Sequence, residues 1–292
     1  MDCKQRIKLS RDCISAWEAV PAGDLQGMKL GAWLFLIMIN DLFVADTTLW
    51  KYVDDTTLVE SVSKNETSYM QLRVDELVRQ SEADGFQLNE SKCKELRISF
   101  SRSGSSVDHI TINDKQIEVV SSAKLLGVVV SDNLRWNAHV ESICKKAATR
   151  LYFLKQLNRA KVPAKDMPLF CTTCIRPVLE YACPVFHHSL PQYLSNEMER
   201  LQKRALRIIQ PDLSYDEALV ALDITSLYER RKALSNALFD QIVRDQSRKL
   251  HDLLLPRNGS TYCTRSQRCF KLPICKTNRF KNTFIMANSF NC

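Results

Sequence analysis

The chain has 292 residues, 45% of them hydrophobic, which is ordinary for a globular protein and enough for one large or two smaller cores. Its 7 glycines and 9 prolines argue against long low-complexity segments. The longest apolar run, residues 30–39, is about half of a bilayer span, and residues 1–6 lack the apolar stretch of a secretory signal. We therefore expect an intracellular protein without a membrane partner.

The formal net charge of +8 is concentrated in the later part of the chain. Residues 1–100 carry 12 Lys and Arg against 16 Asp and Glu, whereas residues 101–292 carry 29 against 17. A basic region of this size suits contact with a phosphate backbone, although a basic helical domain can also simply be soluble.

Eleven cysteines are scattered without the paired spacing of a metal site. Cys171 and Cys174 form one CxxC that has no second half and no nearby His pair. Since they lie in an apolar, helix-like stretch, we expect buried reduced thiols in preference to a zinc site.

Residues 1–131 show a mixture of strand and helix patterns. Hydrophobic spacing and turn residues predict first a hairpin over 5–20, a loop over 21–27 and a buried apolar helix over 30–43. A hairpin over 49–59 and a helix over 65–83, capped by Gly85, are predicted next. The region is expected to end with a strand over 95–101, a loop over 102–108, a hairpin over 110–119 turning at Asn113 and Asp114, and a strand over 123–130.

From Leu134 onward the pattern becomes helical. Apolar residues at three- and four-residue spacing predict helices over 134–157, 164–181, 193–209 and 227–243, and Pro177 predicts a break near Arg176 in the second. Basic residues occupy the other faces of these helices. The tail, residues 258–292, interleaves basic and aromatic residues; we favour docking of the tail on the domain over a nucleic-acid-binding arm.

Asp54 and Asp55 lie between two short runs of residues that favour extended backbone, which predicts a hairpin with both carboxylates at its tip. Adjacent carboxylates repel each other unless a cation lies beside them, and a divalent metal removes that penalty. Asp-Asp is also a common dipeptide in solvated turns.

Tyr52-Val53-Asp54-Asp55 resembles the active-site motif of reverse transcriptases. Three further segments resemble that family in the same order: Gln26-Gly27 ahead of the apolar helix, Leu88-Asn89 with Lys92, and Leu126-Gly127 in a strand. The closest resemblance is to the polymerase of non-LTR (LINE-type) retrotransposons, and it extends through the helical region to near the C-terminus.

The resemblance implies an α+β fold, with a partial polymerase palm over 1–131, made of an antiparallel sheet with packed helices. A mainly α-helical thumb-like domain over 132–257 and a basic tail over 258–292 would follow. It implies Mg²⁺ or Mn²⁺ as cofactor, an RNA template and RNA–DNA duplex as partners, and dNTP if the chain is active. The implied site residues are catalytic and metal-binding Asp54 and Asp55, a candidate proton donor Lys92, nucleotide-binding Gln26, Gly27 and Tyr52, primer-grip Leu126 and Gly127, and nucleic-acid-binding Lys145, Lys146, Arg150, Lys203, Arg204 and Arg207.

The sequence departs from the family in ways that bear on activity. Leu25 and Ala32 stand where the family usually has proline, and no acid among residues 1–24 has the setting of the first catalytic Asp. Nucleotidyl transfer by two metals needs about three convergent carboxylates. We therefore expect a truncated RNA-directed DNA polymerase that is inactive alone; the alternative is a non-catalytic nucleic-acid-binding or helical interaction protein.

Overall fold

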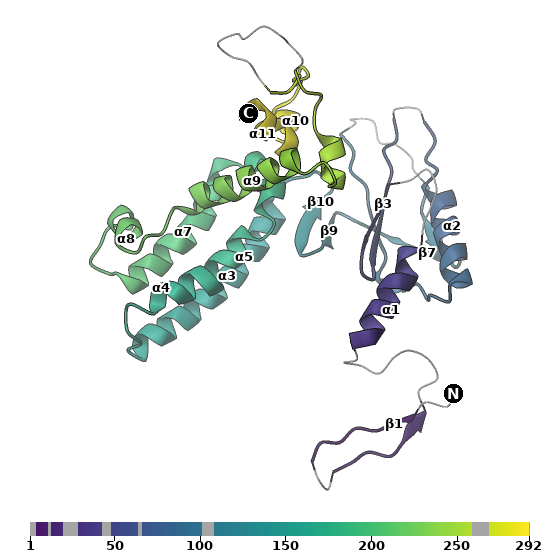
Figure 1. The fold of residues 1–292 in the computed structure, drawn as a ribbon, viewed down its shortest axis with the longest axis horizontal. Coiled ribbons are helices and arrows are strands. Elements are labelled where there is room, and N and C mark those ends of the chain that lie inside the picture. The colour runs from purple at the N-terminus through teal and green to yellow at the C-terminus, as the bar shows by residue number, and fades with distance from the viewer. Residues whose placement is uncertain are drawn as a thin grey trace. The chain divides into compact units, whose positions relative to one another are not determined.

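The computed structural model describes residues 4–10, 13–19, 29–42, 48–63, 66–100, 108–258 and 269–291, which form helices and small antiparallel sheets (Figure 1). It divides into two compact units. The first contains residues 1–95 and 101–120, and the second contains residues 96–100 and 121–292. The predicted mixture of helix and sheet is confirmed at the level of the α+β class, whereas a polymerase palm and thumb are not shown. The predicted boundaries at 131 and 257 stay a prediction.

The first unit starts with the predicted hairpin. Strand β1 (Lys4–Gln5) pairs antiparallel with β2 (Glu18–Ala19), and a bridge between Lys8 and Ile14 continues the pairing toward the turn. The predicted loop over 21–27 lies outside the described residues.

Helix α1 (Lys29–Asn40) forms where it was predicted, but the expectation that it would be buried is wrong. Ile39 is buried, while Trp33, Ile37 and Met38 are 67%, 64% and 51% exposed. The reason is that its neighbours in the unit cover one side only: Ile39 packs in a cluster with Leu77. An apolar sequence all round predicts burial only when enough other chain is available to cover every side.

The acidic hairpin is confirmed. Strand β3 (Thr48–Tyr52) pairs antiparallel with β4 (Asp55–Val59), from Thr48 opposite Val59 to Tyr52 opposite Asp55. Lys51 ties this hairpin to α1: its Nζ donates to the carbonyl oxygens of Ile39, Asn40 and Leu42 at 2.9, 2.7 and 2.7 Å. The ammonium thus satisfies carbonyls that a helix leaves unpaired at its C-terminal end.

Helix α2 (Met70–Ala83) begins five residues later than predicted and ends as predicted, at Gly85 with φ +76°. The rest of the first unit is short strands: β6 (Thr111–Ile112) and β7 (Lys115–Gln116) form the predicted hairpin, with Asn113 and Asp114 both at positive φ. The strand expected over 95–101 is shorter, at β5 (Lys94–Leu96), which pairs with β8 (Glu118–Val120). Most of the loop expected over 102–108 lies outside the described residues.

In the second unit, the single strand predicted over 123–130 is wrong. The chain forms a hairpin there, β9 (Ser122–Leu125) paired with β10 (Val128–Ser131). Leu126 and Gly127 make the turn at φ 45° and 87°, a geometry that suits two-residue hairpin loops. Gly127 was the available signal, since a glycine inside a strand pattern often marks a turn or a close approach.

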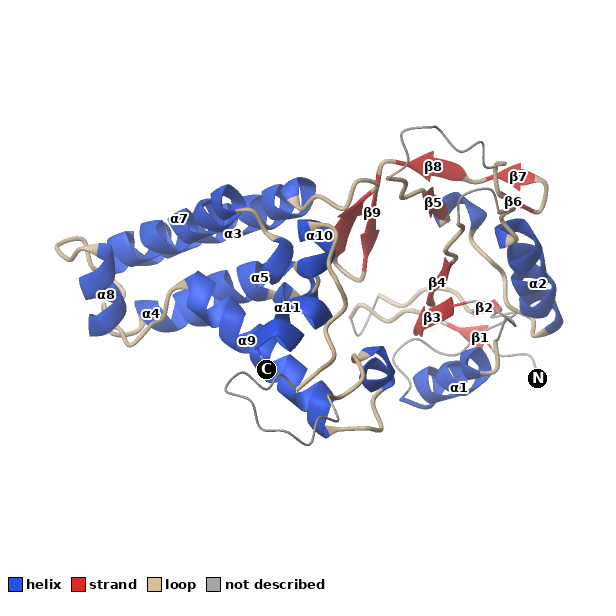
Figure 2. Ribbon diagram, turned by 90° about the horizontal axis from the view of Figure 1, so that it is seen from above, coloured by secondary structure: helices blue, strands red, loops and turns tan. Residues whose placement is uncertain are grey.

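Four helical segments follow as antiparallel and parallel neighbours (Figure 2). They are α3 (Asn137–Arg159), the segment of α4 (Met167–Phe170), a π-helical turn (Cys171–Ile175) and α5 (Arg176–Glu180), then α7 (Gln192–Ile209) and α9 (Leu227–Arg244). The predicted break before Pro177 is present as the π-helical turn. Proline lacks the N–H that would bond to the Thr173 carbonyl in a regular α-helix. The next carbonyl, that of Cys174, accepts from Arg150.

Shorter helices complete the unit: α6 (Cys183–Phe186), α8 (Tyr215–Ala221), α10 (Asn278–Lys281) and α11 (Phe284–Asn291). Docking of the tail is confirmed for its described part. Phe270 is 2% exposed and contacts Phe239 of α9 edge to face, as does Phe284. The core of the unit is one apolar cluster that includes Val140, Leu154, Ile175, Met198 and Leu227.

The expectation of buried thiols holds for only some of the described cysteines: Cys144, Cys171 and Cys183 are buried, whereas Cys13 and Cys269 are exposed. Cys171 is a buried free thiol, and burial raises its pKa to about 11. Cys174 is free as well and partly buried. The described part of the chain contains no group of three or more His, Cys, Asp or Glu side chains that could hold a metal ion.

Candidate functional site

The Asp54–Asp55 turn is the first candidate. Val53 and Asp54 are the two residues of the turn, and Asp55 is the first residue of β4. Val53 has φ +56°, which strains a β-branched residue by about 1–3 kcal/mol. Tyr52 is 63% exposed and both aspartates are exposed. The structure therefore presents two neighbouring carboxylates on the surface; their binding of Mg²⁺ or Mn²⁺ stays a prediction.

The other predicted polymerase residues belong to other segments of the chain. Lys92 is exposed at the end of a 3₁₀ turn (Glu90–Lys92). Gln26 and Gly27 lie outside the described residues. Leu126 and Gly127, in the second unit, are the two residues of the turn between β9 and β10. The Leu126 carbonyl accepts a hydrogen bond from the Tyr181 hydroxyl at 2.8 Å.

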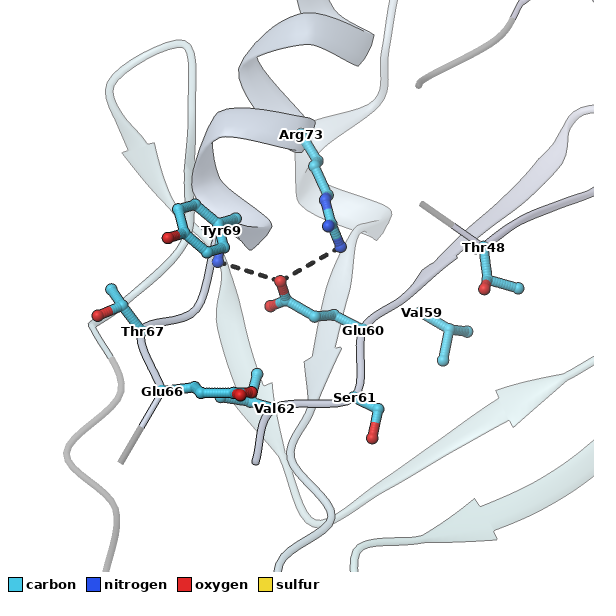
Figure 3. Close-up of a pocket in the computed structure, with 9 residues that line it drawn as sticks. All are labelled: Thr48, Val59, Glu60, Ser61, Val62, Glu66, Thr67, Tyr69 and Arg73. Carbon is cyan, nitrogen blue, oxygen red and sulfur yellow. Dashed lines mark hydrogen bonds and ion pairs between the residues drawn. The ribbon is translucent and has the colours of Figure 1, made fainter. Parts of the chain in front are cut away.

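A pocket lies at the opposite end of the β3–β4 hairpin, next to the first turn of α2 (Figure 3). Figure 3 shows the Glu60 carboxylate between the Tyr69 backbone nitrogen and the Arg73 guanidinium, at 3.0 and 3.2 Å. The second Glu60 oxygen accepts from the Ser68 hydroxyl at 2.6 Å. The carboxylate is thus already satisfied by its own neighbours, and its position at the N-terminus of α2 explains why the helix starts there.

A buried polar cluster occurs in the second unit, among α7, α9 and the 3₁₀ turn His187–Ser189. Arg231 is fully buried, and its Nη2 donates to the Ser195 hydroxyl at 2.7 Å. Its Nε and Nη1, and Nδ1 of the buried His187, have no hydrogen-bond partner among the described residues. Burial lowers the pKa of His187 to about 4, with the neighbouring cations adding to the effect. This cluster affects stability rather than offering an accessible surface.

The basic face of α3 is exposed. The helix carries five Lys or Arg and one acid, Glu141, which pairs with Lys145 at 2.6 Å. Lys145 and Lys146 are exposed as the sequence predicts, and so are Lys155 and Arg159. Arg150 differs: it is partly buried and donates to the Cys174 carbonyl, so its first role is structural.

Helix α7 presents a second basic face. Arg200, Lys203, Arg204 and Arg207 are all exposed, opposite a buried stripe that includes Met198 and Leu201. Lys203 lies over the Tyr215 ring with its Nζ 4.9 Å from the centroid. Arg204 and Arg207 form no ion pair with any residue that the structure describes, so their charge is available to a ligand.

The two basic faces adjoin each other. Helices α3 and α7 pack side by side and run in the same direction (Figure 2). Their starts are joined by hydrogen bonds from Trp136 to Ser189 at 2.7 Å and from the exposed Asn137 to the exposed Tyr193 at 2.8 Å. Five whole turns onward from Asn137 lead to Lys155 on α3, and about two and three turns onward from Tyr193 lead to Arg200 and Arg204 on α7.

The sequence reasoning missed one feature of this surface. Tyr152 and Phe153 are 57% and 53% exposed, with ring centroids 5.9 Å apart at 71°. The available signal was their position off the apolar stripe, because Leu151 and Leu154 take the buried positions on either side.

Comparison with known proteins gives one segment of similarity. Residues 136–176 match the family model described as "Alkylated DNA repair protein alkB homolog 8, N-terminal". The segment spans α3, α4 and the π-helical turn, and is too small a part of the chain to assign the protein to that family. No curated protein and no solved structure matches the chain. Among the described residues, no helix is both long and apolar enough to cross a membrane.

This match corrects the interpretation drawn from the four sequence motifs. It falls within the stretch interpreted as a polymerase thumb, and it points to a family other than reverse transcriptases. The prediction of a LINE-type reverse transcriptase with polymerase activity is therefore contradicted. The four motifs are short, and two of them, at Tyr52–Asp55 and at Leu126-Gly127, form ordinary hairpin turns, which is why their order alone misled.

Proposed function

We propose that the chain is a non-catalytic nucleic-acid-binding protein, and that the exposed basic faces of α3 and α7 form its binding surface. The observation that carries the proposal is the pair of neighbouring helices on which Lys155, Arg200, Arg204 and Arg207 are exposed. Rigid helices hold these charges in a fixed array, so little conformational entropy is lost when phosphates bind.

The family match supports the same surface. It covers α3, with Lys145 and Lys146, and the name of that family refers to repair of alkylated DNA. The net charge supports it too, because residues 101–292 carry the whole excess of basic residues. A duplex of RNA and DNA is one ligand that such a surface would accept through its phosphates.

The competing explanation is structural. Basic residues in the last turn of a helix favour the negative end of its dipole, which accounts for Arg159 and Arg207. It does not account for Lys146 and Arg200, which lie further toward the middle of their helices. A helical interaction protein with an acidic partner is the remaining alternative.

The test is binding of a fluorescein-labelled oligonucleotide, single-stranded and as duplex, measured by anisotropy over a range of salt concentrations. The logarithm of the association constant should fall steeply and linearly with the logarithm of salt concentration. Arg204→Glu with Arg207→Glu should weaken binding at least about tenfold and reduce the salt slope by about 2, one for each lost phosphate contact.

The matched control is Lys92→Glu with Lys115→Glu, which changes net charge equally at two exposed positions of the first unit. This control should bind within about twofold of the wild type, because it leaves every basic residue of α3 and α7 in place. Equal losses in both variants, or no measurable binding by the wild type at low salt, would contradict the proposed function.

A further inference from the structure

Tyr152 and Phe153 expose their rings within the basic surface of α3. More than half of each side chain is accessible, at 57% and 53%. The two residues lie in the fifth turn of α3, about two turns before its C-terminal end at Arg159, and so not at a frayed terminus. Since their neighbours Leu151 and Leu154 are buried at 2% and 0%, the helix is firmly held and its orientation is not in question.

Cationic side chains lie before and after the rings along the helix. Lys145 and Arg159 are seven residues to either side of Tyr152, on the same face and about 10 Å away along the axis. Lys146 has the same relation to Phe153, and Lys155 lies one turn beyond Tyr152. Lys155 lies on the line of Asn137, five whole turns further on, and Asn137 bonds to Tyr193 of α7, so this cation lies between the rings and the α7 side of the helix.

Aromatic rings interleaved with cations match a single strand of nucleic acid better than a duplex. In a duplex the bases stack on each other and offer only their edges, whereas an unpaired strand exposes base faces that stack on aromatic side chains. The cations on either side can then hold the phosphates. A protein partner would use the same rings, but the surrounding Lys and Arg would need acidic side chains opposite them.

We propose that Tyr152 and Phe153 form a base-stacking platform, and that the ligand of the basic surface is single-stranded nucleic acid. The inference rests on the proposed function, since it names the ligand class of the same surface. Stacking provides affinity that charge alone does not, so the protein prefers a single strand to the duplex of the same sequence.

The experiment compares the full chain with Tyr152→Ala/Phe153→Ala, using a labelled single-stranded oligonucleotide and the duplex made from it. The double variant should lose at least about tenfold in affinity for the single strand and stay within about twofold for the duplex. Its salt slope should be unchanged, because no phosphate contact is removed. Tyr152→Phe/Phe153→Tyr, which keeps both rings, should restore single-strand binding.

The matched control is Tyr69→Ala/Phe280→Ala, which removes two aromatic side chains that are 57% and 46% exposed elsewhere in the chain. It should bind the single strand like the wild type. Far-UV circular dichroism and melting temperature check that each variant is folded; exposed positions change stability little.

The outcomes separate this inference from the proposed function. If the ring-deletion variant binds the single strand normally, or loses both ligands equally, the platform is overturned while the salt-dependent binding and its loss in Arg204→Glu/Arg207→Glu still support the proposed function. If the wild type binds neither ligand, both fall. If the variant abolishes self-association in analytical ultracentrifugation without affecting single-strand binding, the rings form a protein contact and the platform is likewise overturned.

Discussion

In the second unit one apolar cluster continues from Val140 to Leu227, whereas the first unit divides its buried side chains between two small clusters. The first unit also leaves Trp33, Ile37 and Met38 of α1 largely exposed. Both units contain a similar share of hydrophobic residues. The difference shows that a hydrophobic sequence stabilises a unit only when other elements are positioned to cover it.

Polar contacts compensate in part within the first unit. Lys51 joins β3 to the end of α1 through three hydrogen bonds, and Glu60 joins the end of β4 to the start of α2. In the second unit, polar contacts add to the packing of a continuous apolar core. Glu199, for example, accepts from the backbone N–H groups of Leu227 and Tyr228 at the start of α9.

The largest expected effect comes from opening the second core. Leu154→Ala removes a side chain that is 0% exposed, and should lower the free energy of unfolding by about 2–5 kcal/mol. Leu72→Ala makes the same change at a position in α2 that is 65% exposed, and should cost less than about 0.5 kcal/mol. Urea unfolding followed by circular dichroism measures both changes. Similar losses would show that Leu154 does not contribute to a packed core in the second unit.

Acidification should weaken the second unit through His187. The pKa of His187 is about 4 in the folded chain, against an ordinary value of 6.5. As the pH falls, the imidazole is therefore protonated in the unfolded state at a higher pH than in the folded state. The stabilisation is complete above about pH 6.5 and is lost as pH falls toward 4, by about 3 kcal/mol at most. Comparing melting temperatures at pH 7 and pH 4.5 tests this.

His187→Gln should flatten that pH dependence, because glutamine has no proton to gain in this range. His109→Gln is the control, since His109 is exposed in the first unit. A pH profile that is the same in His187→Gln and the wild type would show that other groups cause the acid sensitivity.

A smaller effect is expected from the polar tie of the first unit. Lys51→Met keeps the length of the side chain but removes the ammonium, leaving the carbonyls of Ile39, Asn40 and Leu42 without this donor, and should cost about 1–3 kcal/mol. Hydrogen exchange should quicken in the last turn of α1. Lys115→Met, at an exposed position in β7, should leave exchange there unchanged.

Several elements were predictable because their signals are local. Residues 137–159, 192–209 and 227–244 form helices where the apolar spacing placed them, and Asn113-Asp114 turns a hairpin as expected. The Leu126-Gly127 turn was missed because the flanking valines suggested one continuous strand. The start of α2 was misplaced because Glu60, ten residues before Met70, sets it from outside the helix.

The candidate site shows the same limit. Its charges were predicted from composition, and Lys203, Arg204 and Arg207 are exposed as expected. The capture of Arg150 by a carbonyl and the exposure of Tyr152 and Phe153 depend on contacts between segments that are distant in sequence. Motif order led to a polymerase, and the match over 136–176 contradicts it.

The amino-acid sequence by itself determined where the long helices run, which of their faces are apolar, and that the positive charge gathers after residue 100, because these properties depend on residue type and spacing. Only the tertiary structure decided that α1 stays partly uncovered and that the basic faces of α3 and α7 adjoin. Burial and adjacency are properties of which segments meet, and no local pattern specifies the partner that a face will find.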